Sequence, residues 1–388
     1  ATVIFSSGST GEPKGVMLSQ FNLLANVEQC GEVINLDPTQ RLLGILPFFH
    51  SFGFTVTLCV PLLLGTGVIF YPNPLDARGI GALVREHKIT VLLATATFLQ
   101  IYLRGVAPED FGSLKLVVTG AEKLPERLAA AFEERFGIRP LEGYGCTECS
   151  PAVAINTWDY RAPGFYQVGG KRGKIGQPVP GMCVRIADAE DPWNGRALPP
   201  GESGMLLVRG PNLMLGYLGQ PDKTAQVLRP LVAATPSSPD GQRAGTAHPP
   251  HGDEASPPLW YCTGDMAMVD EDGFLQITGR QNRFSKIGGE MVPHLKIEEK
   301  LQELTGLAEQ VFVVMGVPDE KKGERLIVLH KFAEADLPAL LEKFAACDLP
   351  NLWKPKADAF HRVENFPVLG TGKLDLRGVK EMAEKCAA

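Results

Sequence analysis

The segment from Phe5 to Gly15 carries residue types that bind phosphate. It reads FSSGSTGEPKG and follows a short apolar, strand-like run. Glycines let phosphate oxygens approach the backbone, hydroxyl and amide groups donate hydrogen bonds, and Lys14 supplies a positive charge. The segment is not a Walker A loop, because Pro13 precedes the lysine and Gly15 follows it. By itself it is either a phosphate-binding loop or a flexible Gly/Ser turn.

A second pattern is the C-x-x-C formed by Cys146 and Cys149. Cysteines at this spacing occur in redox and zinc sites, but no second C-x-x-C or His pair accompanies them. The eight cysteines are scattered along 388 residues. This density is far below that of a disulfide framework. We therefore expect free thiols in a reducing, cytoplasmic compartment.

The composition is that of a soluble globular protein, with 44% hydrophobic and 21% charged residues. The length suggests about two to three domains. Lys and Arg total 38 and Asp and Glu total 44, so the net charge is −6. Nucleic acid requires a basic surface, so it is not an expected partner.

The apolar pattern predicts an α/β fold. Residues 91–94 and 116–119 are short apolar runs, typical of buried parallel strands. Residues 97–103 and 125–136 are predicted helices, the second with Pro125 near its start, where a missing N–H costs little.

From about residue 178 to 278 the pattern changes to short alternating strands, which predicts a β-rich subdomain. Asp270 to Gly273 forms a hairpin signal within it. Residues 230–258 hold seven prolines and no aromatic residue, so we expect a mobile surface insertion there.

Residues 51–71 carry no charge and are long enough to span a bilayer. Pro61, Gly65 and Gly67 interrupt the run, which favours a buried helix turning into a buried strand over a transmembrane segment.

The last hundred residues form a second unit. We predict a large domain over residues 1–281 and a small α+β domain over residues 282–388. Within the small domain we expect helices over 295–304 and 337–346, strands over 310–317 and 326–332, and a final polar helix.

The segment from Phe5 to Gly15 closely resembles the signature loop of the adenylate-forming superfamily, which includes acyl-CoA synthetases, luciferases and nonribosomal adenylation domains. Further family motifs follow in order along nearly the whole chain. They are LPFFHS at 46–51, GAE at 120–122, YGCTE at 144–148, the run 201–217, YCTGD at 261–265, GR at 279–280 and GTGK at 370–373. The resemblance implies a large N-terminal domain with a β-rich subdomain, a small C-terminal domain, and the use of ATP and Mg²⁺.

The resemblance also implies roles for individual residues. The residues expected to contact the β- and γ-phosphates are Ser6, Ser7, Gly8, Ser9, Thr10, Gly11 and Lys14. The adenine side is formed by Gly120, Ala121, Glu122, Tyr144 and Gly145, with Tyr144 stacking on the base. Asp265 and Arg280 are the expected ribose contacts, and an ionised carboxylate suits ribose hydroxyls.

The reacting atoms have their own set of implied residues. Glu148 is the expected Mg²⁺ ligand, and Thr147 contacts the α-phosphate. Lys373 is expected to bridge the substrate carboxylate and the α-phosphate. His50 is expected at the acyl pocket beside Phe48 and Phe49, unless it is simply a core residue. In this context Cys146 occupies a variable position of the YGCTE motif.

The small domain of the family rotates between the two half-reactions. Asn282 stands at the hinge position, where the family often has an acidic residue or Lys. Residues 286–290 would then face the incoming thiol.

The implied reaction is ATP-dependent activation of a fatty acid to acyl-AMP, followed by thioester formation. Segments 283–292 and 366–373 most resemble synthetase domains that are joined to a 2-acylglycerophosphoethanolamine acyltransferase. That resemblance implies acyl carrier protein as acceptor, lysophospholipid acylation, an acyltransferase domain upstream, and a location at the inner face of the cytoplasmic membrane. The alternatives are a fatty acyl-CoA synthetase, with CoA as acceptor, and a non-catalytic nucleotide-binding fragment.

The family's large domain normally begins well before the phosphate loop, which here starts at residue 6. We therefore expect a large domain that is incomplete at its N-terminus, with reduced stability and without full activity from residues 1–388 alone.

Overall fold

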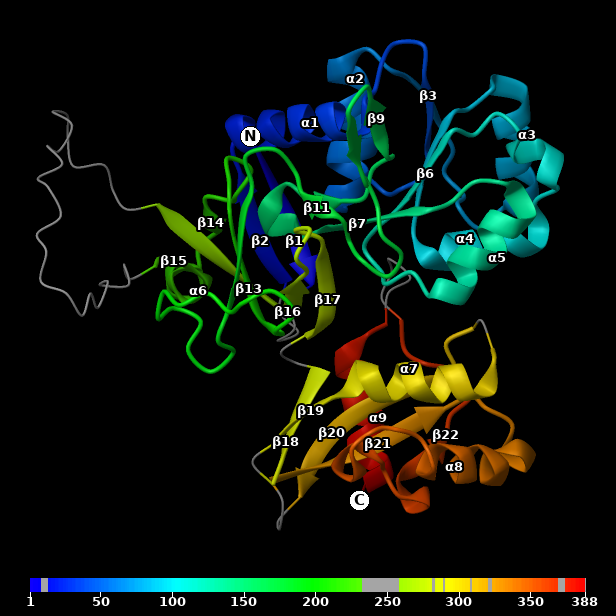
Figure 1. The fold of residues 1–388 in the computed structure, drawn as a ribbon, viewed down its shortest axis with the longest axis vertical. Helices are drawn as coiled ribbons and strands as arrows, with labels where there is room; N and C mark the ends of the chain where they lie inside the picture. The colour runs from blue at the N-terminus through cyan, green and yellow to red at the C-terminus, as the bar shows by residue number, and fades with distance from the viewer. Residues whose placement is uncertain are drawn as a thin grey trace, which may run out of the picture.

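The structure is a computed structural model. It describes the whole chain except residues 8–12, 232–257, 281–282, 289, 308, 320–322, 369–373 and 388. Several predicted site residues lie outside the described part, namely Gly8, Ser9, Thr10, Gly11, Asn282 and Lys373. Most of the predicted surface insertion lies outside it too. Figure 1 shows a larger N-terminal part above a smaller C-terminal part, which begins after the strand β17 (Leu275–Arg280).

A seven-stranded sheet organises the larger part. Its strand order is β11-β8-β7-β6-β5-β3-β4. The strands are β3 (Arg41–Gly44), β4 (Gly67–Phe70), β5 (Val91–Ala94), β6 (Leu116–Thr119), β7 (Leu141–Gly145), β8 (Ala152–Ile155) and β11 (Gln177–Pro178). The strands from β4 to β7 run parallel, and β8 and β11 are antiparallel additions. All residues of β5 and β6 are buried, which confirms the prediction of buried parallel strands.

Helices cover both faces of this sheet. Figure 1 shows α1 (Gln20–Ile34) and α2 (Val60–Leu64) on one side, and α3 (Ala77–His87), α4 (Ala96–Gly105) and α5 (Glu126–Phe136) on the other. Local signals set their ends. The Thr95 side chain accepts a hydrogen bond from the Phe98 N–H at the start of α4, and Gly137 ends α5 with a φ of 70°. The predicted helices thus form close to their expected bounds.

The uncharged segment 51–71 folds differently from its prediction. It forms a π-helix, η1 (Phe52–Cys59), then α2 and the edge strand β4. Leu62 and Leu63 are 65% and 56% exposed. The expectation of a wholly buried segment is therefore wrong. In addition, β4 has a sheet neighbour on one side only, and its Phe70 is exposed. Among the described residues, none of the helices combines the length and apolarity needed to cross a bilayer.

Two smaller sheets flank the main one. The first joins β1 (Thr2–Ser7), β2 (Pro13–Leu18) and β14 (Gly216–Tyr217). The second joins β12 (Cys183–Ala187), β13 (Gly204–Arg209), β15 (Leu228–Pro230), β16 (Leu259–Val269) and β17. A short hairpin, β9 (Tyr160–Ala162) with β10 (Phe165–Gln167), and the helix α6 (Pro221–Val227) complete this part. The predicted hairpin lies between β16 and β17, where the Asp270 carboxylate accepts from the Asp272 and Phe274 N–H groups.

The C-terminal part is a sheet covered on both faces. Its strands are β18 (Phe284–Ile287), β19 (Glu290–Pro293), β20 (Phe312–Asp319), β21 (Gly323–His330) and β22 (Phe360–Arg362), and its helices are α7 (His294–Thr305), α8 (Leu337–Ala345) and α9 (Leu376–Ala387). Alternate residues of β20 point to opposite faces. Phe312 and Val314 pack in the core with α7 and α8, whereas Val313 and Met315 pack in a second core with α9.

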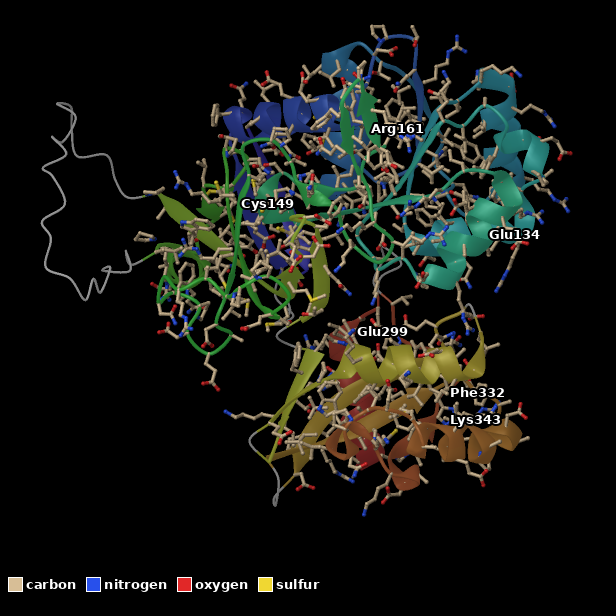
Figure 2. The ribbon with its side chains drawn as sticks, viewed as in Figure 1. Glu134, Cys149, Arg161, Glu299, Phe332 and Lys343 are labelled. Carbon is tan, nitrogen blue, oxygen red and sulfur yellow. The ribbon has the colours of Figure 1, made fainter. Side chains whose placement is uncertain are left out.

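The two parts meet along α7. Lys123 of the larger part forms an ion pair with Glu299, and Arg127 donates to the Glu303 carbonyl at 3.3 Å. Figure 2 shows Glu299 on the side of α7 that faces the larger part. The contact is polar and partly exposed, so it stabilises this arrangement only weakly.

Candidate active site

The predicted site residues gather at the carboxyl end of β7. This strand ends at Gly145, and the 3₁₀ turn η3 (Thr147–Cys149) follows directly. Figure 2 labels Cys149, the last residue of η3, in the interior of the larger part. In open α/β sheets ligands bind outside the carboxyl ends of the parallel strands, because the loops there converge.

One corner of the site is built around Asp265, which is only 4% exposed. The antiparallel pairing of β16 with β17 places Asp265 opposite Arg280, whose Nε lies 2.6 Å from Oδ1. The Tyr144 hydroxyl donates to the other oxygen, Oδ2. The Asp265 charge raises the pKa of Arg280, while burial and then Asp265 raise the pKa of Tyr144. The structure therefore brings together three residues that the sequence predicted around adenine and ribose.

A second corner is built around Glu148, which is 9% exposed. The Tyr217 hydroxyl donates to its Oε1 at 2.8 Å. Next to it, the Thr147 and Ser51 hydroxyl oxygens lie 3.2 Å apart. Within the described part of the chain, no basic side chain forms an ion pair with Glu148. We call Glu148, Tyr217, Tyr144, Asp265 and Arg280 the strand-end cluster.

This donor set fits Mg²⁺ bound with a nucleotide. A buried carboxylate without a cationic partner is costly, and a metal ion would compensate it. Mg²⁺ takes one or two carboxylates together with phosphate oxygens and water, so a single Glu148 with neighbouring hydroxyls suffices.

The described part of the phosphate segment lies on the β1–β2 hairpin. Ser6 stands opposite Lys14, and Ser7 opposite Pro13. The Lys14 ammonium lies 5.0 Å from the centroid of the Tyr217 ring. Lys14 and Glu148, predicted as phosphate and metal contacts, are therefore both neighbours of one tyrosine.

The adenine-side segment follows β6. Ala121 has a φ of 70°, and a Cβ added to Gly120 would lie 3.2 Å from the Phe52 ring. Glu122 accepts hydrogen bonds from the Thr97 N–H and hydroxyl at 3.0 and 2.9 Å. Its carboxylate therefore also stabilises the first turn of α4.

The aromatic segment before η1 lies on the same side of the sheet. His50 accepts a hydrogen bond from the Phe52 N–H at its Nδ1, 3.2 Å away. Phe48 and Phe49 are 44% and 66% exposed. The neighbouring Ser51 contacts Thr147, so the segment reaches the site, and the gating role of His50 stays a prediction.

The cysteine pair surrounds Thr147 and Glu148 in sequence. The two sulfur atoms lie 3.3 Å apart as thiols. The hydrogen bond with Cys149, together with burial, raises the pKa of Cys146, which makes it a poor nucleophile. Among the described residues no group of three His, Cys, Asp or Glu side chains forms a metal site, so the pair lacks the further ligands that zinc requires.

Two residues of the site received no role from the sequence. Tyr217 closes the predicted run 201–217, and Ser51 closes the LPFFHS segment. Both lie in recognised motifs, but a pattern of residue types does not say which side chain touches which. A cavity of about 580 Å³ lies elsewhere, lined by Cys183, Arg209, Leu228 and Leu259 among others, and holds none of the predicted site residues.

An open, mostly parallel sheet, with a phosphate-type hairpin beside it and buried carboxylates near the carboxyl end of β7, is typical of nucleotide-binding proteins of the α/β class. The AMP-binding enzyme family matches residues 1–218, more than half of the chain. The chain belongs to this family, as the motifs indicated.

Named relatives agree with this assignment. The chain is 33% identical over 353 residues to a long-chain-fatty-acid–CoA ligase of Bacillus subtilis, covering 88% of this chain and 54% of the relative. It is 31% identical to a feruloyl-CoA synthase of an Amycolatopsis species, covering 83% and 57%. An ATP-bound crystal structure of MatB from Rhodopseudomonas palustris matches with a TM-score of 0.79 and 26% identity, covering 100% of this chain and 68% of that one. The chain thus spans about half the length of the curated relatives it matches, and its fold is that of adenylate-forming enzymes.

Proposed function

We propose that this protein is an ATP-dependent, AMP-forming acid–thiol ligase that activates a long-chain fatty acid and transfers it to CoA. The observation that carries the proposal is the strand-end cluster. Glu148 follows β7, the Asp265–Arg280 pair of the neighbouring sheet contacts Tyr144 near the end of the same strand, and Tyr217 links Glu148 to Lys14. The fatty-acid specificity is supported by the Bacillus subtilis relative, which is a long-chain-fatty-acid–CoA ligase.

The reaction has two steps. A carboxylate oxygen of the fatty acid attacks the α-phosphorus of ATP, the bond to pyrophosphate breaks, and acyl-AMP forms. The thiolate then attacks the acyl carbon and AMP leaves. Bound Mg²⁺ would neutralise phosphate charge during the first step. The chain's own residues bind and orient the substrates, with Asp265 and Arg280 at the ribose, Lys14 and the serines at the phosphates, and Lys373 at the reacting oxygens.

CoA is a better supported acceptor than acyl carrier protein. The two curated relatives described above are named as a CoA ligase and a CoA synthase. The sequence-based link to acyl carrier protein, and from it to lysophospholipid acylation, depends on the resemblance of segments 283–292 and 366–373 alone.

Trapping of the activated acid tests the proposal. The full-length protein is incubated with Mg²⁺–ATP, hydroxylamine and one of three acids: palmitate, octanoate or ferulate. We expect palmitoyl hydroxamate as the main product. Lys373→Ala should lower its rate of formation about 10²–10³-fold, the usual effect of losing one transition-state charge contact. The exposed Lys380 on α9 provides a matched control, and Lys380→Ala should leave the rate unchanged.

Each outcome decides one part of the proposal. Ferulate as the best acid would overturn the fatty-acid assignment. Thioester on a carrier protein but not on CoA would restore the sequence-based prediction of the acceptor. Nucleotide binding without hydroxamate from any acid would contradict the ligase activity and favour a binding function.

A further inference from the structure

Tyr217 contacts both predicted charge-handling groups of the site. Its hydroxyl donates to Glu148 Oε1 at 2.8 Å, and its ring lies 5.0 Å from the Lys14 ammonium. It is 3% exposed, and Glu148 is 9% exposed, so the hydrogen bond between them is made away from bulk water. We propose that Tyr217 is a positioning residue for metal–nucleotide binding, which orients the Glu148 carboxylate. This inference rests on the proposed function.

The backbone holds Tyr217 in place from two sides. In the strand β14, Gly216 and Tyr217 pair with Met17 and Val16 of β2, shortly after Lys14. On the other side, the Tyr217 N–H donates to the Thr224 hydroxyl at 2.9 Å. The side chain therefore has little freedom to leave Glu148.

Gly216 makes this close approach to α6 feasible. It has a φ of 142°, and a Cβ at this position would lie 2.8 Å from the Thr224 methyl group. A glycine at position 216 therefore allows β14 to lie close to α6, and this packing places the Tyr217 ring.

The hydrogen bond has a direct consequence for Glu148. A carboxylate can rotate about its last bond, and Mg²⁺ demands near-ideal octahedral geometry. With Oε1 held by the Tyr217 hydroxyl, rotation of the carboxylate is restricted, and Oε2, which accepts no hydrogen bond from the residues the structure describes, is the oxygen left for the metal. Removal of a group that holds a metal ligand in this way typically weakens metal affinity about 10–100-fold.

The Lys14 contact ties the same tyrosine to the phosphate hairpin. A cation over an aromatic face is attracted by the ring's electrons. Because β14 is paired with β2, the ring, Lys14 and Glu148 are held as one unit. The metal-binding and phosphate-binding sides of the site are therefore positioned by a common element.

The test measures metal binding without any acid substrate. Mn²⁺, a stand-in for Mg²⁺, is titrated into the full-length protein with a non-hydrolysable ATP analogue, and free Mn²⁺ is followed by electron paramagnetic resonance. Tyr217→Phe keeps the ring and removes the hydroxyl, and should weaken Mn²⁺ binding about tenfold. Tyr102→Phe is the matched control, since Tyr102 is also buried and its hydroxyl donates to the Pro74 carbonyl at 2.8 Å, far from the site.

A double-mutant cycle then identifies the partner. If Tyr217 acts through Glu148, Tyr217→Phe should cause no further loss of Mn²⁺ affinity in a Glu148→Gln background. Melting temperatures of the two tyrosine variants report their folding, and we expect similar values.

The results separate the inference from the proposed function. Equal Mn²⁺ affinity in wild type and Tyr217→Phe, or equal losses in Tyr217→Phe and Tyr102→Phe, would overturn the positioning role. So would a full additional loss in the Glu148→Gln background. If wild-type protein binds no metal–nucleotide at all, the proposed function itself is wrong.

Discussion

The described part of the molecule contains two polar clusters built around buried carboxylates, and one of them is more open to solvent than the other. The strand-end cluster lies in the larger part. The second, which we call the small-domain cluster, consists of Arg283, Ser285, His294 and Glu298, each at most 6% exposed. Arg283 pairs with Glu298, and the Ser285 hydroxyl lies 2.8 Å from His294 Nε2. The strand-end cluster, in contrast, contains Arg280, whose side chain is 56% exposed.

The difference shows that buried ionisable groups do not by themselves mark an active site. The small-domain cluster has a Ser–His pair and a nearby glutamate, which resemble parts of a hydrolytic triad. However, its main contacts are made inside the core between β18, β20 and α7, where Glu298 accepts hydrogen bonds from Arg283 and from the Val314 N–H. The strand-end cluster faces the carboxyl edge of a parallel sheet, where ligands have access. We therefore expect substitutions in the small-domain cluster to lower stability, and substitutions in the strand-end cluster to weaken nucleotide binding.

The largest expected effect is on stability in the small-domain cluster. Arg283→Met leaves the Glu298 carboxylate buried without its charge partner, which should lower the free energy of unfolding by about 3–5 kcal/mol. Urea denaturation measures it. Arg172→Met is the matched control, because Arg172 pairs with Glu133 on the surface and should contribute less than about 1 kcal/mol. If Arg283→Met left the urea midpoint unchanged and weakened ATP binding instead, the small-domain cluster would be a binding site and not a structural one.

The next effect is on nucleotide binding in the strand-end cluster. Asp265→Asn keeps the size of the side chain but removes the charge facing Arg280 and the expected ribose. Affinity for an ATP analogue, measured by calorimetry, should fall about 10–100-fold, or about 1.4–2.7 kcal/mol. Asp272→Asn is the matched control, because Asp272 lies on the exposed hairpin seven residues after Asp265, and this variant should bind like wild type. Identical affinities for the two variants would remove Asp265 from the nucleotide site.

The last effect is a pH dependence of stability. Burial, and then the charge of Arg283, lower the pKa of His294 to about 3. The folded chain therefore keeps His294 neutral, while the unfolded chain binds a proton below about pH 6.5. This contribution to stability is present above pH 6.5 and is lost as the pH falls toward 3, by about 2 kcal/mol between pH 7 and pH 5.

Urea midpoints at several pH values measure this dependence. The variant His294→Gln cannot titrate at this position, so its decline toward acid pH should be shallower than that of wild type. Equal slopes for the two proteins would show that His294 is not held neutral in the fold.

Much of the fold was predictable because local patterns determine local elements. The apolar runs at β5 and β6 can only be buried, so strands of a covered parallel sheet follow from the residues alone. The segment 51–71 was harder. Its lack of charge indicated burial, but Leu62 and Leu63 of α2 and Phe70 of the edge strand β4 are exposed, because burial depends on where these elements lie among the others.

The candidate site also has a part that the sequence predicts and a part that it does not. The sequence by itself determined the residue types of the family motifs, and hence Glu148, Asp265, Arg280 and Tyr144 as candidates. Only the tertiary structure brought Asp265 within reach of Tyr144, 121 residues away, and Tyr217 within reach of Glu148, 69 residues away. The physical reason is that hydrogen bonds act over about 3 Å, so their partners are fixed by the packing of whole sheets rather than by spacing along the chain.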